Sequence, residues 1–104
     1  MITSCQQVCA KINQYKDKKI YLVFYSQWCG YSKKALALLE STKTDAKCYI
    51  VDKILGSREK LLSCLISDAE NTSFDKNHKT VPIIFYQGKF LGGYTELSNK
   101  LNAK

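Results

Sequence analysis

A buried-strand pattern that leads directly into a helix pattern, with a cysteine at the join, constrains this chain more than any other feature. Residues 20–25 form an apolar run rich in β-branched and aromatic side chains, which is typical of a buried strand. Cys29 and Gly30 follow, and residues 32–39 have the pattern of a helix start. A cysteine at such a join faces unpaired backbone N–H groups and the positive end of the helix dipole, which favour thiolate over thiol. The sequence therefore nominates Cys29 as a reactive nucleophile.

Length and composition predict one ordinary globular domain. The chain has 104 residues, of which 45% are hydrophobic and 24% are charged, as expected for a soluble protein with a modest core. No apolar run approaches the roughly 20 residues that a membrane span needs. The first residues also lack the basic-then-apolar layout of a secretory signal. We therefore expect a single domain over residues 1–104 that is cytoplasmic and monomeric and has no membrane partner.

The charge distribution limits the classes of partner that the chain is expected to bind. The net charge of +7 comes from lysines spread along the chain, and no basic block is interleaved with aromatic residues. Because nucleic-acid grooves are typically built from such blocks, we expect no nucleic-acid partner. A positive charge of this size favours the approach of anionic small molecules.

The five cysteines form no metal-binding pattern. Their odd number leaves at least one without a partner in the chain, and there is one histidine and no pair of Cys-x-x-Cys motifs, so we expect no structural zinc site. In a reducing compartment the cysteines are expected to be free thiols. Cys5 and Cys9 lie one helical turn apart and are predicted to serve in packing, and Cys48 and Cys64 are predicted to lie in the core.

The apolar spacing predicts the element order α-β-α-β-α-β-β-α. Thr3 or Ser4 can cap the first helix, Ser57 can cap the third, and Thr95 can cap the last. The apolar spacing predicts a strand over 20–25, a helix over about 30–42 and a strand over 47–52. Residues 67–79 are predicted to form a largely polar loop with a possible helical turn. The apolar runs 81–86 and 89–92, with turn residues between them, predict a hairpin. A strand–helix–strand crossover makes the first two strands parallel, and the hairpin adds antiparallel strands.

Three short motifs, each at a predicted element boundary, give the chain a resemblance to a known protein family. They are Cys-Gly-Tyr-Ser at 29–32, Thr-Val-Pro at 80–82 and Gly-Gly at 92–93. In this order they resemble the glutaredoxin family of the thioredoxin-like superfamily, over roughly residues 15–104. The resemblance implies an α/β, thioredoxin-like (glutaredoxin) fold with a four-stranded mixed sheet flanked by helices. It also implies a redox-active centre for disulfide exchange, electron transport and cell redox homeostasis.

The resemblance also implies roles for individual residues. Cys29 would be the catalytic nucleophile, and the hydroxyl of Ser32 would hydrogen-bond to its thiolate. Pro82 would follow a cis peptide bond that points the backbone of Val81 at the substrate. The glutathione-binding residues would be Tyr31, Lys79, Thr80, Val81, Pro82, Gly92, Gly93, Tyr94, Thr95 and Glu96.

Two positions depart from the family pattern. Many members carry a lysine three residues before the nucleophile, where this chain has Ser26. Stabilisation of the thiolate would then depend on the helix terminus, with Lys33 or Lys34 as supplementary charges. Thr95 replaces the first of two acidic residues that commonly follow the glycine pair.

The function implied is that of a glutathione-disulfide oxidoreductase. Cys29 would remove glutathione from glutathionylated proteins or small disulfides by a monothiol mechanism, with glutathione as co-substrate. Because position 32 is serine, the two-cysteine reduction of protein disulfides would be absent or weak. A dithiol glutaredoxin whose resolving cysteine at position 32 was engineered to Ser32 is an alternative that stays open.

Two further alternatives compete with this function. Cys-Gly-Tyr-Ser resembles the Cys-Gly-Phe-Ser of glutaredoxins that hold a [2Fe–2S] cluster between two subunits. Cys29 would then be a metal ligand, glutathione would supply further thiolates, and the chain would be a dimer. The extra residues before the cysteine and the Trp-Pro near the cis-proline that those proteins carry are missing here. A generic thioredoxin is the third option, and the glycine pair argues against it.

Overall fold

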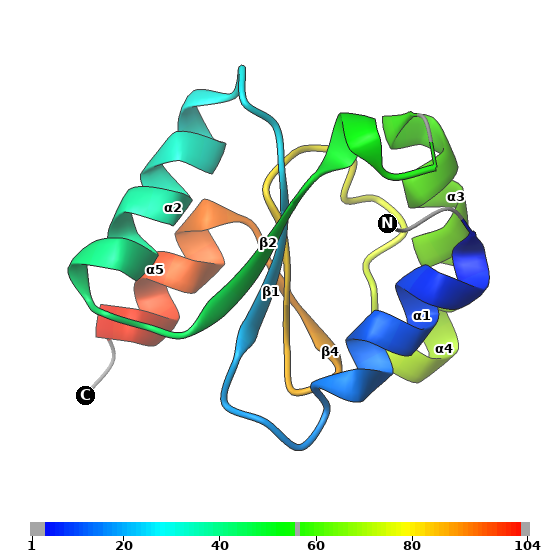
Figure 1. Ribbon diagram of the computed structural model, residues 1–104, viewed down its shortest axis with the longest axis horizontal. Coiled ribbons are helices and arrows are strands. Elements are labelled where there is room, and N and C mark those ends of the chain that lie inside the picture. The colour runs from blue at the N-terminus through cyan, green and yellow to red at the C-terminus, as the bar shows by residue number, and fades with distance from the viewer. Residues whose placement is uncertain (1–3, 56, 103–104) are drawn as a thin grey trace.

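The computed structural model describes residues 4–55 and 57–102 as a sheet between two layers of helices (Figure 1). Four strands form the sheet: β1 (Tyr21–Tyr25), β2 (Ala46–Ile50), β3 (Ile83–Tyr86) and β4 (Lys89–Gly92). Their order is β2-β1-β3-β4. β1 pairs with β2 in parallel and with β3 antiparallel, and β3 pairs antiparallel with β4. The predicted four-stranded mixed sheet is therefore confirmed.

The helices divide between the two faces of the sheet (Figure 1). One face carries α2 (Gly30–Ser41) and α5 (Tyr94–Asn102), and the other carries α1 (Cys5–Gln14), α3 (Arg58–Ser67) and the short α4 (Ala69–Thr72). A 3-10 turn, η1 (Val51–Lys53), follows β2 directly. Among the described residues, no helix is long and apolar enough to cross a membrane.

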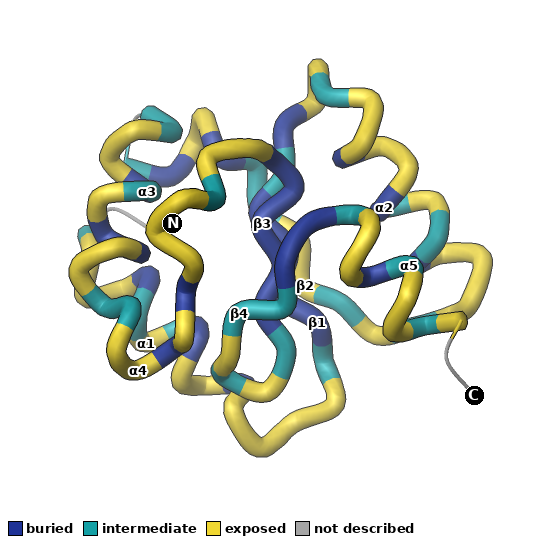
Figure 2. Tube along the Cα trace, turned by 180° about the vertical axis from the view of Figure 1, so that it is seen from behind, coloured by how far each residue is buried: buried dark blue, intermediate teal, exposed yellow. Residues whose placement is uncertain are grey.

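Alternation along β1 creates two apolar clusters. Tyr21 and Val23 join the cluster under α2 and α5, whereas Leu22 and Phe24 join the cluster under α1 and α3. Side chains alternate between the faces of a strand, so a strand that is apolar at every position must be covered on both faces. Figure 2 shows the result, with the central strands β1 and β3 buried and the outer surfaces of the helices exposed.

Two of the three helices with a predicted cap begin at that cap. The Ser4 side chain accepts from the Gln7 backbone N–H and the Gln7 side chain accepts from the Ser4 N–H, which together form a capping box. Ser57 caps α3 by accepting from the Lys60 N–H. Thr3, the other candidate for the first cap, lies outside the described residues. The helical turn predicted within 67–79 is α4.

The last helix and the second strand differ from their predictions. α5 begins at Tyr94, so Thr95 lies inside its first turn and does not cap it. Gly93 precedes the helix instead, and its carbonyl accepts the first helical hydrogen bond, from the Leu97 N–H. β2 ends at Ile50 because residues 51–53 tighten into the 3-10 turn.

The prediction that the cysteines are free, packing thiols is wrong for two of them. Cys5 and Cys64 form a disulfide between α1 and α3, with their Cα atoms 5.4 Å apart. The two helices pack side by side, which brings together residues 59 positions apart in the chain. Cys9, Cys29 and Cys48 are free. Cys48 is exposed, and not in the core as predicted, because β2 is an edge strand.

Candidate functional site

Cys29 lies where the carboxyl end of β1 leads into α2. It is the N-cap residue of α2, with an extended backbone, and its carbonyl accepts the first helical hydrogen bond from the Lys33 N–H at 3.1 Å. A Cβ at Gly30 would meet nothing within 4 Å, so that position is open to solvent. The backbone N–H groups of Tyr31 and Ser32 lie in the first turn of α2, where N–H groups have no partner within the helix, and they favour the thiolate of Cys29.

These groups lower the pKa of the Cys29 thiol. Partial burial acts in the opposite direction and raises the pKa. The backbone and side-chain hydrogen bonds from Ser32, the backbone hydrogen bond from Tyr31 and the positive charge of Arg58 outweigh that burial, so the pKa falls below its ordinary value. The positive charge that supplements the helix terminus comes from Arg58 on α3. Lys33 or Lys34 had been expected from the sequence in this role.

Two buried serines fix the turn that carries Cys29. The Ser26 N–H donates to the Ser32 hydroxyl oxygen at 3.2 Å, and the Trp28 N–H donates to the Ser26 hydroxyl oxygen at 3.3 Å. Both serine side chains are buried. Ser26, found where many glutaredoxins have lysine, therefore helps to shape the turn and adds no charge. The Ser32 side chain is fully buried in the first turn of α2.

The cis-proline loop faces Cys29 from the start of β3. The Val81–Pro82 peptide bond is cis, as predicted. The Cys29 thiol donates to the Val81 carbonyl oxygen at a distance of 3.4 Å. Both Val81 and Pro82 are buried, and the loop places the backbone of Val81 beside the reactive sulfur.

A pocket beside this pair gathers most of the predicted glutathione-binding residues. Its lining comes from the start of α2, the cis-proline loop and the start of α5, and consists of Tyr31, His78, Thr80, Val81, Pro82, Gly93, Tyr94, Thr95 and Glu96. Of the predicted residues, Lys79 and Gly92 do not line it. Lys79 is exposed and directly precedes the lining residue Thr80 in the chain. Gly92 directly precedes the lining residue Gly93.

The glycine pair lets Glu96 fold back against the backbone. Gly92 has φ +139°, and a Cβ built there would collide with the Glu96 side chain. The Gly93 N–H donates to the Glu96 carboxylate at 2.7 Å. Only glycine adopts this backbone without strain and leaves room for the carboxylate. Glu96 is thereby held at the pocket, where its carboxylate offers a negative charge suited to a cationic group.

His78 is a pocket residue whose position the sequence did not predict. Its Nε2 lies 3.3 Å from the Pro82 carbonyl oxygen, and its ring packs edge-on against Phe74 and Phe90, at centroid distances of 6.4 and 5.0 Å. The available sequence signal was Phe74, an aromatic residue within the polar segment 67–79. Its side chain is only 4% exposed, because the segment folds back onto the core.

Two aromatic side chains beside Cys29 are exposed. Trp28 is 86% exposed and Tyr31 is 61% exposed. The Lys34 ammonium lies 5.3 Å from the centroid of the Tyr31 ring, within the range of a cation–π contact. The face around the thiol therefore presents aromatic surface and positive charge to an incoming molecule.

The match to a family model decides the class of protein. The glutaredoxin model matches residues 21–91, a span that runs from β1 through the cis-proline loop into β4.

The chain belongs to the glutaredoxin family.

Known glutaredoxins resemble the chain in sequence and in structure. A probable glutaredoxin of Acanthamoeba polyphaga mimivirus is 34% identical over 88 residues, which cover 85% of this chain and 83% of that protein. The dithiolic glutaredoxin of Trypanosoma brucei brucei superposes with a TM-score of 0.64 at 29% identity, covering 88% of this chain and 81% of that one. The holo form of glutaredoxin C1 from Populus tremula x tremuloides superposes with a TM-score of 0.64 at 25% identity, covering 91% and 86%.

Family membership makes this glutaredoxin a thiol–disulfide oxidoreductase with a thioredoxin-like fold. Within the described ranges 4–55 and 57–102, no three His, Cys, Asp or Glu side chains are grouped to hold a metal ion. The cluster-binding alternative would draw its other ligands from glutathione and a second chain, and it stays a prediction.

Proposed function

We propose that this glutaredoxin uses glutathione to remove glutathione from mixed disulfides, by a monothiol mechanism at Cys29. The observation that carries the proposal is the position of the Cys29 sulfur, 3.4 Å from the carbonyl oxygen of Val81, a residue that lines the pocket. The same pocket offers groups suited to a peptide with charged ends. A cytoplasmic setting would supply the reduced glutathione that such a cycle consumes.

The pocket can recognise a γ-glutamyl tripeptide along its length. The backbone of Val81 can pair with the cysteinyl residue as an added strand does. The N–H groups at the start of α5, on Tyr94 and Thr95, suit a carboxylate, and the carboxylate of Glu96 suits the adjacent ammonium group. Lys79, exposed on the loop before Val81, can reach the carboxylate at the glycyl end.

The reaction balances with one protein thiol. The Cys29 thiolate attacks the glutathione sulfur of the mixed disulfide; the new bond joins Cys29 to glutathione, and the substrate thiolate leaves and takes a proton from water. The thiolate of a second glutathione then attacks the glutathione sulfur bound to Cys29. Glutathione disulfide forms and the Cys29 thiolate is released. Each cycle oxidises one free glutathione thiol, reduces the substrate sulfur to a thiol and releases one molecule of glutathione disulfide.

Ser32 excludes the dithiol route for the chain as it stands. A hydroxyl cannot form a disulfide, so Cys29 must be resolved by a thiol from solution. The Ser32 side chain hydrogen-bonds to the Cys29 sulfur and lowers the pKa of the thiol, which improves Cys29 both as attacker and as leaving group.

The test compares the chain with Cys29→Ser. Incubation of the chain, with Cys29 free and the Cys5–Cys64 disulfide intact, with glutathione disulfide, followed by mass spectrometry of peptides, is expected to place one glutathione on Cys29. Cys29→Ser should lose all reduction of a glutathionylated peptide, whereas Cys48→Ser should keep it, because Cys48 lies on the edge strand β2. Retained activity in Cys29→Ser would refute the assignment.

A further inference from the structure

The Cys5–Cys64 disulfide joins two sulfurs in unequal surroundings. Cys5 is exposed and is the first residue of α1. Cys64 is 2% exposed and lies in the third turn of α3, among the buried residues of that helix. A thiol from solution can therefore approach the bridge only from the Cys5 side, since attack on a disulfide requires access to the sulfur that is attacked.

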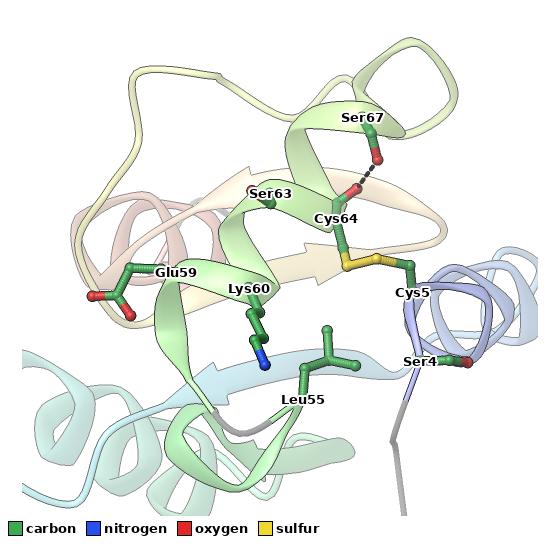
Figure 3. A pocket seen from close by; sticks show the side chains of 8 residues that line it. All are labelled: Ser4, Cys5, Leu55, Glu59, Lys60, Ser63, Cys64 and Ser67. Atoms are coloured by element: carbon green, nitrogen blue, oxygen red, sulfur yellow. Dashed lines mark hydrogen bonds between the residues drawn. A yellow bond between two sulfur atoms is a disulfide. The ribbon is translucent and has the colours of Figure 1, made fainter.

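The disulfide forms part of the wall of a surface pocket with a volume of about 650 Å³ (Figure 3). Besides the two cysteines, the lining consists of Ser4, Leu55, Glu59, Lys60, Ser63 and Ser67. This pocket shares no residue with the pocket beside Cys29. Figure 3 shows the Lys60 side chain extending beside Leu55, whereas the Glu59 side chain points away from the bridge.

We propose that the Cys5–Cys64 disulfide is a second thiol–disulfide exchange site, which a small anionic thiol opens from this pocket by attack on the sulfur of Cys5. The pocket is large enough for a peptide-sized thiol. Lys60 would attract a carboxylate of that thiol. The site does not involve Cys29, so it can operate whether or not the proposed function holds.

The exchange balances with two molecules of thiol. The incoming thiolate forms a bond to the Cys5 sulfur, the Cys5–Cys64 bond breaks, and Cys64 leaves as a thiolate that takes a proton from water. A second thiolate then attacks the sulfur of the thiol attached to Cys5, which forms the oxidised small disulfide and releases Cys5. Two small thiols are oxidised and one protein disulfide is reduced. Attack by Cys64 on the mixed disulfide reverses the first step.

A third cysteine near the bridge is kept out of this exchange. Cys9 lies one turn after Cys5 on α1 and faces Asp68, which lies one turn after Cys64 at the end of α3. Burial, then the hydrogen bond and the negative charge of Asp68, raise the pKa of the Cys9 thiol to about 11. Cys9 therefore stays protonated and does not attack the neighbouring bridge. The attacking thiol must come from solution, and the mixed disulfide forms on Cys5.

The first experiment maps where a thiol attaches. The oxidised chain carrying Cys29→Ser is treated with reduced glutathione, quenched with acid, alkylated, and read by tandem mass spectrometry. We expect glutathione on Cys5 and an alkylated Cys64. Glutathione on Cys64 or Cys9 would overturn the proposal. So would an intact bridge at glutathione concentrations that reduce an unstructured peptide disulfide.

A matched pair of variants tests whether Cys5 is more reactive than Cys64 when a thiol of the chain attacks glutathione disulfide. In the Cys29→Ser background, Cys64→Ser and Cys5→Ser are each treated with glutathione disulfide, and circular dichroism confirms that both are folded. Cys5 in the first variant should gain glutathione at least roughly ten times faster than Cys64 in the second, because only Cys5 is accessible. Equal rates would contradict the proposal, and the mapping experiment on the intact bridge holds even if one variant fails to fold.

The role of Lys60 is tested with two thiols of different charge. Lys60→Gln should slow opening by glutathione by roughly two- to fivefold, the effect of one exposed charge, and should leave opening by neutral 2-mercaptoethanol unchanged. Lys47→Gln, on the exposed edge strand β2, is the matched control and should alter neither rate. Equal slowing for both thiols would contradict recognition of an anionic thiol.

Discussion

The sulfur of Cys29 lies 3.4 Å from the carbonyl oxygen of Val81, a residue 52 positions further along the chain. This contact joins the two halves of the site: the helix terminus that activates the thiol and the cis-proline loop whose backbone can hold a peptide. Neither half alone would make the glutathione-dependent exchange site that we propose. The contact arises because β1 and β3 are adjacent and antiparallel, so the end of one strand meets the start of the other.

Arg58 is predicted to help set the ionisation of Cys29. Its positive charge lowers the pKa of the thiol, so Arg58→Ala should raise the midpoint of Cys29 ionisation. At a pH below that midpoint, the rate of alkylation should fall by roughly 1.5- to fivefold, the range for one partly exposed charge. Arg58→Lys should restore most of the rate. An unchanged midpoint in Arg58→Ala would show that the helix terminus alone activates the thiol.

Gly92 is predicted to be intolerant of a side chain. Its φ of +139° is a backbone that favours glycine, and a Cβ there would collide with Glu96. Gly92→Ala should therefore lower the free energy of unfolding by about 1–3 kcal/mol and weaken glutathione binding. Gly30→Ala is the matched control, because a Cβ there meets nothing within 4 Å. Urea unfolding measures both, and equal stabilities for the two variants would contradict the structural role of Gly92.

The Cys5–Cys64 disulfide is predicted to stabilise the fold. It closes a loop with a sequence separation of 59 residues, and a loop of that size corresponds to about 4 kcal/mol in the chain-entropy model, with measured values often nearer 2. Cys5→Ser should therefore lower the free energy of unfolding by about 2–4 kcal/mol under oxidising conditions. Cys48→Ser, which removes an exposed free thiol, should stay within about 0.5 kcal/mol. Identical urea midpoints for Cys5→Ser and the oxidised chain would contradict the prediction.

His78 is predicted to position the cis-proline loop for glutathione. Loss of its contact with the Pro82 carbonyl should raise KM for glutathione by roughly two- to tenfold in His78→Ala, the net effect of one hydrogen bond. His78→Gln keeps a donor and should retain a KM closer to that of the unmodified chain. Because His78 does not contact the reacting sulfur, kcat should change less than KM. A fall in kcat at constant KM would point to a different role.

The sequence predicted the parts of the fold that depend on local pattern. The apolar run of β1, the serine caps at Ser4 and Ser57, and the hairpin after Pro82 all follow from neighbouring residues. The link between a cysteine at a helix start and a lowered thiol pKa was also accessible, because it depends only on the order strand, cysteine, helix. The resemblance to glutaredoxins implied the cis peptide bond before Pro82.

The features that the sequence did not predict depend on tertiary packing. Helical spacing placed Cys5 on a face with Val8 and Ile12, but nothing in that spacing pairs it with Cys64. Likewise, Arg58 affects Cys29 only because α3 packs beside the end of β1. Thr95 satisfied the residue preference for a cap, yet Gly93 and Glu96 supply the helix start in its place. Each of these outcomes was set by contacts between elements far apart in the chain.

The most direct test of the account is the pH dependence of Cys29 alkylation by iodoacetamide, read at the Cys29 peptide by mass spectrometry. The account predicts a midpoint clearly below that of the same cysteine in the urea-unfolded chain, because helix N–H groups, the Ser32 hydroxyl and Arg58 stabilise the thiolate. A midpoint equal to or above the unfolded value would contradict it.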